Sequence, residues 1–205
     1  MSNPSTAHPW LRLTRLDKPI GTYLLLWPTL WALWFASEGL PRAENLLIFC
    51  LGVVVMRAAG CVINDYVDRH VDGAVERTRL RPLPSGEVRA GTALALFFAL
   101  LAVALILVLM TNKLTIILAF GGAAAATLYP FLKRINDWPQ RGVGSAWAWS
   151  TPMAFAAHNS ALPPQLWVIV AAVVLWTIAF DTYYAMVDRE DDLRIGIKST
   201  AILFG

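Results

Sequence analysis

The chain has 205 residues, of which 57% are hydrophobic and only 15% are charged, and its mean hydropathy is +0.55. A soluble domain carries about 25% charged residues, so this composition excludes an ordinary soluble protein. The net charge is +3, and the two cysteines, Cys50 and Cys61, are too few for a disulfide framework or a cysteine metal site.

Apolar segments recur along the chain at lengths that suit a lipid bilayer. A membrane-spanning helix needs about 20 apolar residues, with a range of about 17–25. Six segments fit, at residues 19–37, 46–63, 93–110, 114–132, 142–158 and 166–183. The fifth is the shortest and is interrupted by several polar residues and Pro152. We therefore predict an all-α fold, a polytopic bundle of transmembrane helices.

The basic residues alternate in step with these segments. All but three of the 17 Lys and Arg residues precede the first segment or follow the second, fourth or sixth. Arg42 and Lys113 lie in the other connections, and Arg57 lies inside the second segment. The positive-inside rule places the richly basic connections in the cytoplasm, so we expect the N-terminus there as well.

Two acidic stretches follow the second and the sixth segments, at residues 64–72 (NDYVDRHVD) and 184–192 (YAMVDREDD). Carboxylates packed this closely repel one another and resist leaving water, so they require a cation. Oxygen-only ligands suit a hard ion such as Mg²⁺, which in turn favours a phosphorylated substrate. Both stretches open on the predicted cytoplasmic side, as a single site requires.

The two stretches also resemble each other. Val-Asp-Arg occurs at residues 67–69 and again at residues 187–189, and Asp72 has a counterpart in Asp192. An internal duplication would explain the match and would place the two copies across one cavity.

Helical spacing decides which side chains of the first stretch converge. Asn64, Asp68 and Asp72 are four residues apart and share one stripe if the helix continues through them. Arg57 falls on that stripe roughly 10 Å deeper, at 1.5 Å per residue. A cation near the bilayer centre costs about 2.5–3.5 kcal/mol, so Arg57 should face a polar cavity or partner. Asp65 points away from the stripe.

In the second stretch, the same spacing places Asp181, Asp188 and Asp192 on one face, with Tyr184 beside them. Asp191 points elsewhere. The alternative is that both stretches are ordinary solvated helix ends. Like charges four residues apart destabilise a helix unless something compensates them, which favours a role as ligands.

At these residues the sequence resembles the UbiA-type membrane aromatic prenyltransferases, most closely the 4-hydroxybenzoate polyprenyltransferases. The family's Asn-Asp-x-x-Asp-x-x-x-Asp run is matched by residues 64–72. Its second motif, two aspartates four apart after a tyrosine, is matched by Tyr184, Asp188 and Asp192. Its Tyr-x-x-x-Lys element is similar to Tyr129 and Lys133, which Arg134 follows. Three further stretches look like the 4-hydroxybenzoate branch, at residues 15–21, 81–86 and 196–201.

The resemblance implies transfer of a polyprenyl group from polyprenyl diphosphate to the ring of 4-hydroxybenzoate, ortho to its hydroxyl, in ubiquinone biosynthesis. It implies Mg²⁺ as the cofactor, with one ion on Asn64, Asp68 and Asp72 and a second on Asp188 and Asp192. It implies diphosphate binding by Arg57, Asn64, Tyr129, Lys133, Arg134 and Tyr184. The catalytic residues would be Asp68, Asp72, Asp188, Asp192, Lys133 and Arg134.

Family members usually have about nine transmembrane helices around a central cavity open to the cytoplasmic face. With six candidate spans, we expect residues 1–205 to form one membrane-embedded prenyltransferase domain that lacks its C-terminal helices. The resemblance implies a location in the bacterial inner membrane, with the active site facing the cytoplasm. We expect lipid as a partner and no nucleic acid.

Three alternatives stay open at this point. Other branches of the same superfamily use naphthoate, homogentisate or haem acceptors. A CDP-alcohol phosphotransferase also uses membrane aspartates, although the glycine and paired aspartates of its motif do not follow Asp72 at suitable spacing. An ion-coupled transporter would place its acidic residues near mid-membrane, whereas these lie at one face.

Overall fold

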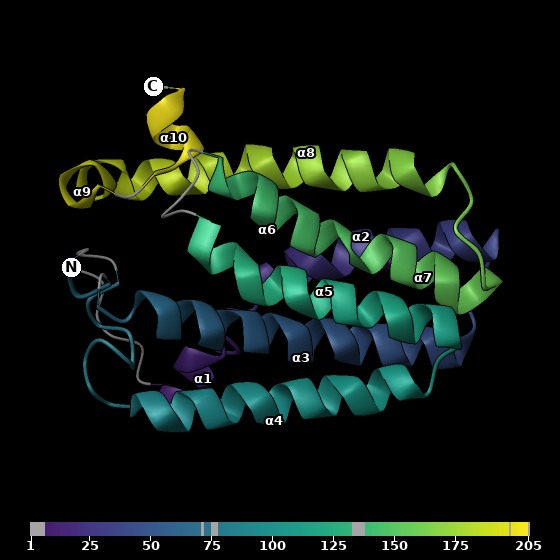
Figure 1. The fold of residues 1–205 in the computed structure, drawn as a ribbon, viewed down its shortest axis with the longest axis horizontal. Coiled ribbons are helices and arrows are strands. Elements are labelled where there is room, and N and C mark those ends of the chain that lie inside the picture. The colour runs from purple at the N-terminus through teal and green to yellow at the C-terminus, as the bar shows by residue number, and fades with distance from the viewer. Residues whose placement is uncertain (1–6, 71, 75–77, 133–137, 197, 205) are drawn as a thin grey trace.

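The computed structural model describes residues 7–70, 72–74, 78–132, 138–196 and 198–204. Over these residues the chain forms helices and no strands, and the long helices lie side by side in a bundle (Figure 1). The predicted all-α fold is therefore confirmed. The α-helices are α1 (Pro9–Leu13), α2 (Ile20–Ser37), α3 (Ala43–Asp68), α4 (Ala90–Leu109), α5 (Lys113–Leu132), α6 (Pro139–Ala148), α7 (Ser150–Asn159), α8 (Leu166–Ala185), α9 (Arg189–Ile195) and α10 (Thr200–Leu203), and the 3₁₀ helices are η1 (Asp72–Ala74) and η2 (Met186–Asp188).

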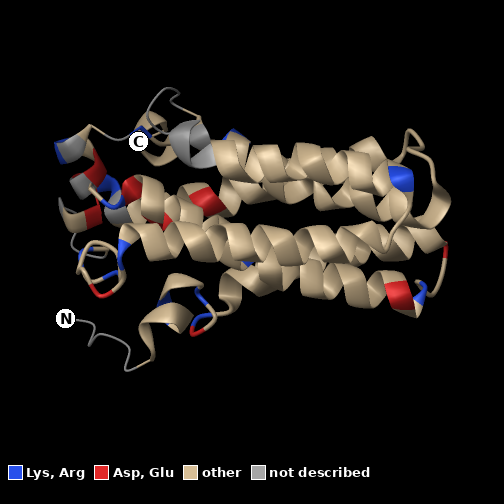
Figure 2. Cartoon of the chain, turned by 60° about the horizontal axis from the view of Figure 1, so that its bottom comes forward, with Lys and Arg blue, Asp and Glu red and all other residues tan. Residues whose placement is uncertain are grey.

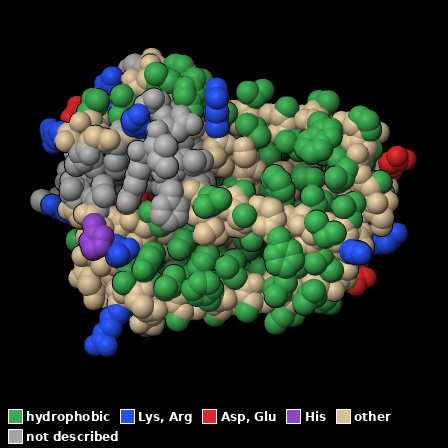
Figure 3. Space-filling view, in the orientation of Figure 1, with side chains coloured by type: hydrophobic (Ala, Val, Ile, Leu, Met, Phe, Trp, Pro, Cys, Tyr) green, Lys and Arg blue, Asp and Glu red, His purple; other side chains and the backbone are tan. Residues whose placement is uncertain are grey.

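Four of the helices in the described part of the chain, α2, α3, α4 and α8, are long and apolar enough to cross a membrane. A shorter apolar stretch of α5, Lys113–Leu128, accompanies them. Large hydrophobic side chains are exposed along these helices, and Figure 3 shows hydrophobic side chains spread along the length of the bundle on the face in view. Exposed apolar surface of this extent suits contact with lipid chains.

The fifth predicted span, residues 142–158, is covered by two consecutive helices in the structure, so the segment is helical but broken near its middle. Helix α6 ends at Ala148 and α7 begins at Ser150, with Trp149 in a helical conformation between them. Pro152 explains the break. It has no N–H to donate to the carbonyl of Ala148 four residues earlier, and its ring clashes with that carbonyl.

The acidic stretches lie at the same end of the bundle. Helices α3 and α8 run in the same direction, and α3 ends at the same end of the bundle at which α8 leads into α9 (Figure 1). Charged residues gather at the two ends of the bundle, and the middle of the helices is nearly free of them in the view of Figure 2. The end of the bundle at which α3 and α8 end carries both acidic stretches, and it is called the acidic end below.

Two buried apolar clusters hold the bundle together. One lies at the acidic end and joins α1, α3, α4 and the connection before α4, through Leu13, Ala59, Val62, Ile63, Val67, Leu83, Val88, Ala93 and Phe97. The other joins α2, the start of α3, α7 and the start of α8, through Ala32, Leu33, Ala36, Ile48, Phe49, Ala154, Phe155, Ala157 and Leu166. The first cluster fixes the end of α3 that carries the first acidic stretch.

Gly144 allows α6 and α8 to approach closely, and we predict that it does not tolerate a side chain. A Cβ built there would lie 3.1 Å from the backbone oxygen of Val174. Gly144→Val should lower the free energy of unfolding by about 1–3 kcal/mol, the usual cost of overpacking.

The matched control for this prediction is Gly91→Val in α4, where an added Cβ would meet nothing within 4 Å. Thermal unfolding in detergent, followed by tryptophan fluorescence, compares the two variants. Equal midpoints for both would contradict the close approach of α6 and α8.

Candidate active site

The first acidic stretch begins on α3 and leaves it before Asp72. Helix α3 ends at Asp68, and Asp72 lies in η1. The prediction of one helical stripe through Asn64, Asp68 and Asp72 was therefore wrong for Asp72. A run of carboxylates at a helix C-terminus opposes the negative end of the helix dipole, and the last turn of α3 has no basic residue to offset it.

Three carboxylates are nevertheless buried together at this end of the molecule. Asp65, Asp68 and Asp72 expose only 1%, 2% and 7% of their surfaces. Asn64 is half-buried on the same last turns of α3. Buried carboxylates need partners, because an unpaired charge away from water is very costly.

Asp65 has two arginine partners. Arg15 donates through Nη2 to both carboxylate oxygens of Asp65, at 2.9 and 3.0 Å. Arg81 donates through Nη1 to Oδ1 of Asp65 at 3.1 Å and to Oδ2 of Asp72 at 2.8 Å. Two arginines therefore meet two carboxylates, and this charge-neutral set (Arg15, Asp65, Asp72 and Arg81) is called the ionic brace below.

Sequence reasoning did not find the ionic brace. Arg15 and Arg81 stand out only because their stretches resemble the family. Neither lies at a helical spacing from Asp65, so the sequence offers no reason to pair them with it. The only available signal was the direction of Asp65, which spacing placed off the stripe of Asn64 and Asp68. A charged side chain that leaves such a stripe while still in an apolar helix must find a cation elsewhere.

Arg57 lies deeper in α3 and lines a cavity of about 370 Å³ inside the bundle. Within the described part of the chain, its buried Nε has no hydrogen-bond partner. Its guanidinium lies 5.6 Å from the ring centre of Trp147. A Cβ at Gly21 would fall 2.5 Å from Nη2 of Arg57, so the absence of a side chain at Gly21, in the first turn of α2, leaves room for the guanidinium.

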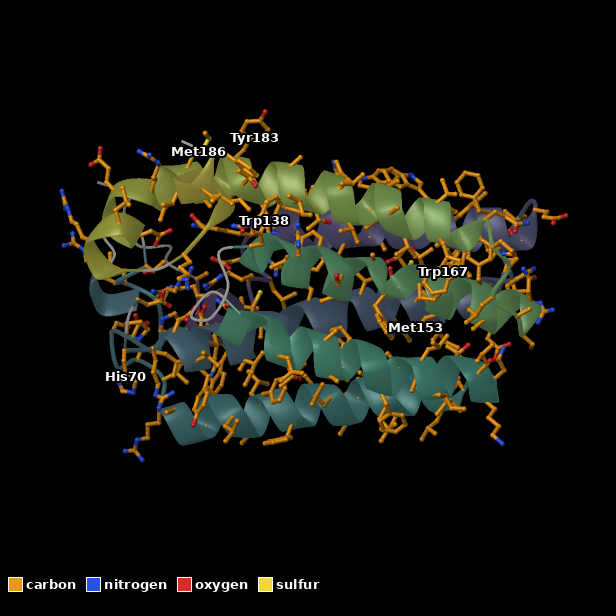
Figure 4. The ribbon with its side chains drawn as sticks, turned by 45° about the horizontal axis from the view of Figure 1, so that its top comes forward. His70, Trp138, Met153, Trp167, Tyr183 and Met186 are labelled. Carbon is orange, nitrogen blue, oxygen red and sulfur yellow. The ribbon has the colours of Figure 1, made fainter. Side chains whose placement is uncertain are left out.

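The cavity walls are mostly apolar and come from six helices, α2 to α7. Small residues of α5 form one wall, namely Ala119, Gly122, Ala123 and Ala126. Met153 of α7, which Figure 4 shows among the helices, contributes to another. Arg57 does line a cavity, but the walls given by the described residues are mostly apolar, so the polar surroundings that the sequence predicted are not found there. An unpaired donor of a buried cation in such a space suits an anionic ligand.

The second acidic stretch runs through η2 into α9. Asp181 and Tyr184 lie on α8, and Asp192 lies on α9. Tyr184 is 60% exposed, whereas Asp181 and Asp192 are half-buried. Figure 4 shows Tyr183 and Met186 pointing away from the bundle. The side chain of Asp188 lies outside the described residues, so the shared face of Asp181, Asp188 and Asp192 stays a prediction.

The predicted Tyr-x-x-x-Lys element falls largely outside the described part of the chain. Tyr129 lies in the last turn of α5, but its side chain is not described. Lys133 and Arg134 lie outside the described residues altogether. Their assignment to the diphosphate therefore stays a prediction.

The donor chemistry of the acidic end fits a hard divalent cation. Asn64, Asp68 and Asp72 offer only oxygen ligands, which Mg²⁺ prefers. Among the described residues, no group of three or more His, Cys, Asp and Glu side chains lies close enough together to hold a metal ion. The fit therefore rests on the type of donors in the first stretch and on their burial.

The family model for the UbiA prenyltransferase family matches residues 25–205. The chain belongs to this family. It is 58% identical to the 4-hydroxybenzoate octaprenyltransferase of Ectopseudomonas mendocina, an alignment that covers 100% of the chain and 71% of that protein. It is 60% identical to the enzyme of the same name from Saccharophagus degradans, with coverage of 98% of the chain and 67% of that protein.

Solved structures of the family share the fold. A UbiA homolog from Aeropyrum pernix K1 superimposes with a TM-score of 0.79 at 27% identity, covering 90% of this chain and 70% of that one. A homolog from Archaeoglobus fulgidus bound to GPP and Mg²⁺ gives 0.79 at 22% identity, covering 97% of this chain and 70% of that one. The predicted family and fold are both confirmed.

The ionic brace predicts that Asp65→Asn lowers the free energy of unfolding much more than Glu87→Gln does. Asp65→Asn leaves Arg15 and Arg81 facing a neutral side chain. This should cost about 3 kcal/mol, the lower end for removing one partner of a buried pair, because both arginines are partly exposed.

Glu87→Gln is the control for Asp65→Asn. It removes the exposed ion pair of Glu87 with Arg12, which should cost less than about 1 kcal/mol. Thermal unfolding of both variants in the same detergent measures the difference. A loss for Asp65→Asn no larger than that for Glu87→Gln would contradict a stabilising role for the brace.

Proposed function

We propose that this chain transfers a polyprenyl group from polyprenyl diphosphate to the ring of 4-hydroxybenzoate, the prenylation step of ubiquinone biosynthesis. The observation that supports this most strongly is the buried acidic end, where oxygen ligands of the first stretch lie beside an apolar helix bundle. The relatives named 4-hydroxybenzoate octaprenyltransferase, at 56–60% identity, support the acceptor.

The acidic residues would hold the ions that the donor needs. Asn64, Asp68 and Asp72 would bind one Mg²⁺, and Asp188 with Asp192 would bind a second. Bound there, the ions would neutralise the charge that develops on the departing diphosphate. A homolog from Archaeoglobus fulgidus has been solved bound to GPP and Mg²⁺ and also bound to Cd²⁺, which supports the use of a divalent cation.

Basic side chains would share in stabilising the leaving group. Arg57, Lys133 and Arg134 would offset negative charge as the bond between the prenyl carbon and the diphosphate oxygen breaks. Tyr129 and Tyr184 would donate hydrogen bonds to the same diphosphate. Of these residues, Arg57 has the clearest structural support, because its buried Nε has no partner among the described residues.

The apolar bundle would protect the reactive carbon. Loss of diphosphate leaves an allylic cation, which water would capture as an alcohol if it had access. The ring carbon ortho to the phenol hydroxyl attacks that cation, and a proton then leaves the ring. The cavity that Arg57 lines offers walls of this kind, to which alanine, glycine and leucine residues contribute.

We propose a location in the bacterial inner membrane, with the acidic end facing the cytoplasm. The basic connections at that end support this orientation through the positive-inside rule. We also propose that residues 1–205 form one membrane-embedded prenyltransferase domain. The chain aligns with about two thirds to 71% of the length of its curated relatives.

The assay that tests this function is formation of prenylated acid from 4-hydroxybenzoate and a polyprenyl diphosphate in membranes containing the protein. Product should form with Mg²⁺ and disappear when a chelator is added, because the carboxylates and the diphosphate are all negative. Undiminished product in metal-free buffer would contradict the metal assignment. Product only with a naphthoate or homogentisate acceptor would contradict the substrate.

Substitution of the proposed ligands should abolish transfer. Asp68→Asn, Asp72→Asn, Asp188→Asn and Asp192→Asn should each reduce the rate by about 100-fold or more, because each removes a group that supports charge stabilisation. Glu87→Gln, at the exposed ion pair with Arg12, should retain the wild-type rate. Wild-type turnover in any one of these variants would show that the substituted aspartate is not a ligand in the proposed site.

The orientation predicts opposite labelling of two engineered cysteines. In a background with Cys50 and Cys61 changed to alanine, Arg79→Cys should react with a membrane-impermeant maleimide only after the inner membrane is opened. Arg42→Cys should react in cells whose outer membrane alone has been permeabilised. Matching accessibility of the two positions would contradict the proposed topology.

A further inference from the structure

Asp72 is the one proposed ligand of the first stretch that does not stand on α3. It lies in η1, beyond the end of the helix that carries Asn64 and Asp68. A ligand outside the helix needs another support, since metal geometry tolerates errors of only a few tenths of an ångström. The structure shows which groups supply this support.

Arg81 holds the side chain of Asp72. Its Nη1 donates to Oδ2 of Asp72 at 2.8 Å and to Oδ1 of Asp65 at 3.1 Å, so one nitrogen ties the connection to α3. The backbone of Asp72 is held as well, since Oγ1 of Thr78 donates to its carbonyl at 2.8 Å. Asp72 is therefore fixed at both its side chain and its main chain.

Asp65 in turn fixes Arg81. Its carboxylate is 1% exposed and stands on α3, one of the most extensively packed helices of the bundle. Arg15, in the segment before α2, donates hydrogen bonds to both oxygens of Asp65. Arg15 does so with a φ of +58°, a left-handed conformation that is costly for a residue with a Cβ. Strain of this kind persists only where the surrounding contacts determine the geometry.

The connection that carries Arg81 is anchored on its other side too. Leu83 and Val88 are buried in the apolar cluster of the acidic end, with Val62 and Phe97. The N–H of Val88 donates to the carbonyl of Pro82 at 2.9 Å. Arg81 thus projects from a segment whose backbone is held by packing, and its guanidinium is held by hydrogen bonds to Asp65 and Asp72.

We propose that Arg81 is a positioning residue, which Asp65 holds in place and which orients the Asp72 carboxylate toward the divalent ion of the first acidic stretch. This inference rests on the proposed function. A carboxylate has about four acceptor sites, so Asp72 can accept a hydrogen bond on Oδ2 and still offer Oδ1 to an ion. Hydrogen bonds to ligating carboxylates typically change metal affinity 10–100-fold when they are lost.

Asp65 therefore acts as part of the support and not as a ligand. Both of its oxygens are engaged by arginines, so an ion there would have to displace at least one guanidinium. The two arginines and two carboxylates cancel in charge, so the brace orients Asp72 without adding net charge beside the ion. Arg81 acts on the reaction through Asp72 alone.

The test is Mn²⁺ binding by purified protein, measured from the loss of the free Mn²⁺ signal in electron paramagnetic resonance. Arg81→Gln should raise the dissociation constant 10–100-fold. Arg79→Gln removes the same charge from an exposed position in the same connection and should leave the constant unchanged. Equal weakening by both variants would mean that only net charge matters, and it would overturn the proposal.

A double-mutant cycle separates positioning from general damage. If Arg81 acts through Asp72, then Arg81→Gln should weaken Mn²⁺ binding in the wild-type background and have no further effect in the Asp72→Asn background. An additional loss in that background would overturn the proposal. Arg81→Lys keeps the charge and serves the same cycle if Arg81→Gln does not fold, with a smaller expected loss, since an ammonium lacks the planar fork of arginine.

A kinetic measurement adds a second readout. In Arg81→Gln the Mg²⁺ concentration for half-maximal transfer should rise 10–100-fold, and the rate should return at saturating Mg²⁺. A rate that stays low at every Mg²⁺ concentration would overturn positioning in favour of direct contact with substrate. If the wild-type protein binds no Mn²⁺, the metal assignment of the proposed function fails. If wild type and Arg81→Gln bind Mn²⁺ equally well, only the positioning role of Arg81 fails.

Discussion

The structure depends on how carboxylates are kept at the end of an apolar helix. Asp65 is almost completely buried, and its charge is tolerable because Arg15 and Arg81 reach it from two segments that are distant in the sequence. Those contacts tie the segment before α2 and the connection before α4 to the end of α3. Burial of one carboxylate therefore organises three parts of the chain around the first acidic stretch.

The same physics shapes the interior of the bundle. Arg57 is a cation among mostly apolar walls, and it is placed where a ligand could supply the missing anion. A polyprenyl diphosphate has the complementary form, with a charged head and a long apolar tail. A bundle that keeps its charges at one end and its apolar surface in the bilayer suits that substrate, because head and tail need opposite surroundings.

Sequence reasoning recovered the membrane helices and the grouping of both acidic stretches at one end, because hydropathy and charge are read residue by residue. It failed where a contact decided the outcome. The break between α6 and α7 is a different case, because Pro152 is visible in the sequence and a break near it could have been predicted. The departure of Asp72 from the stripe depends on where α3 ends, and the role of Asp65 depends on two arginines whose separation in sequence carries no periodicity.

The central claim is that the two acidic stretches bind divalent ions that hold a prenyl diphosphate. Anomalous diffraction at the manganese edge, from crystals grown with Mn²⁺ and a non-hydrolysable prenyl diphosphate analogue, tests it most directly. The account predicts one peak within about 2.0–2.3 Å of oxygens of Asn64, Asp68 and Asp72, and a second at the same distance from Asp188 and Asp192. Ordered diphosphate with no peak at either stretch would contradict it.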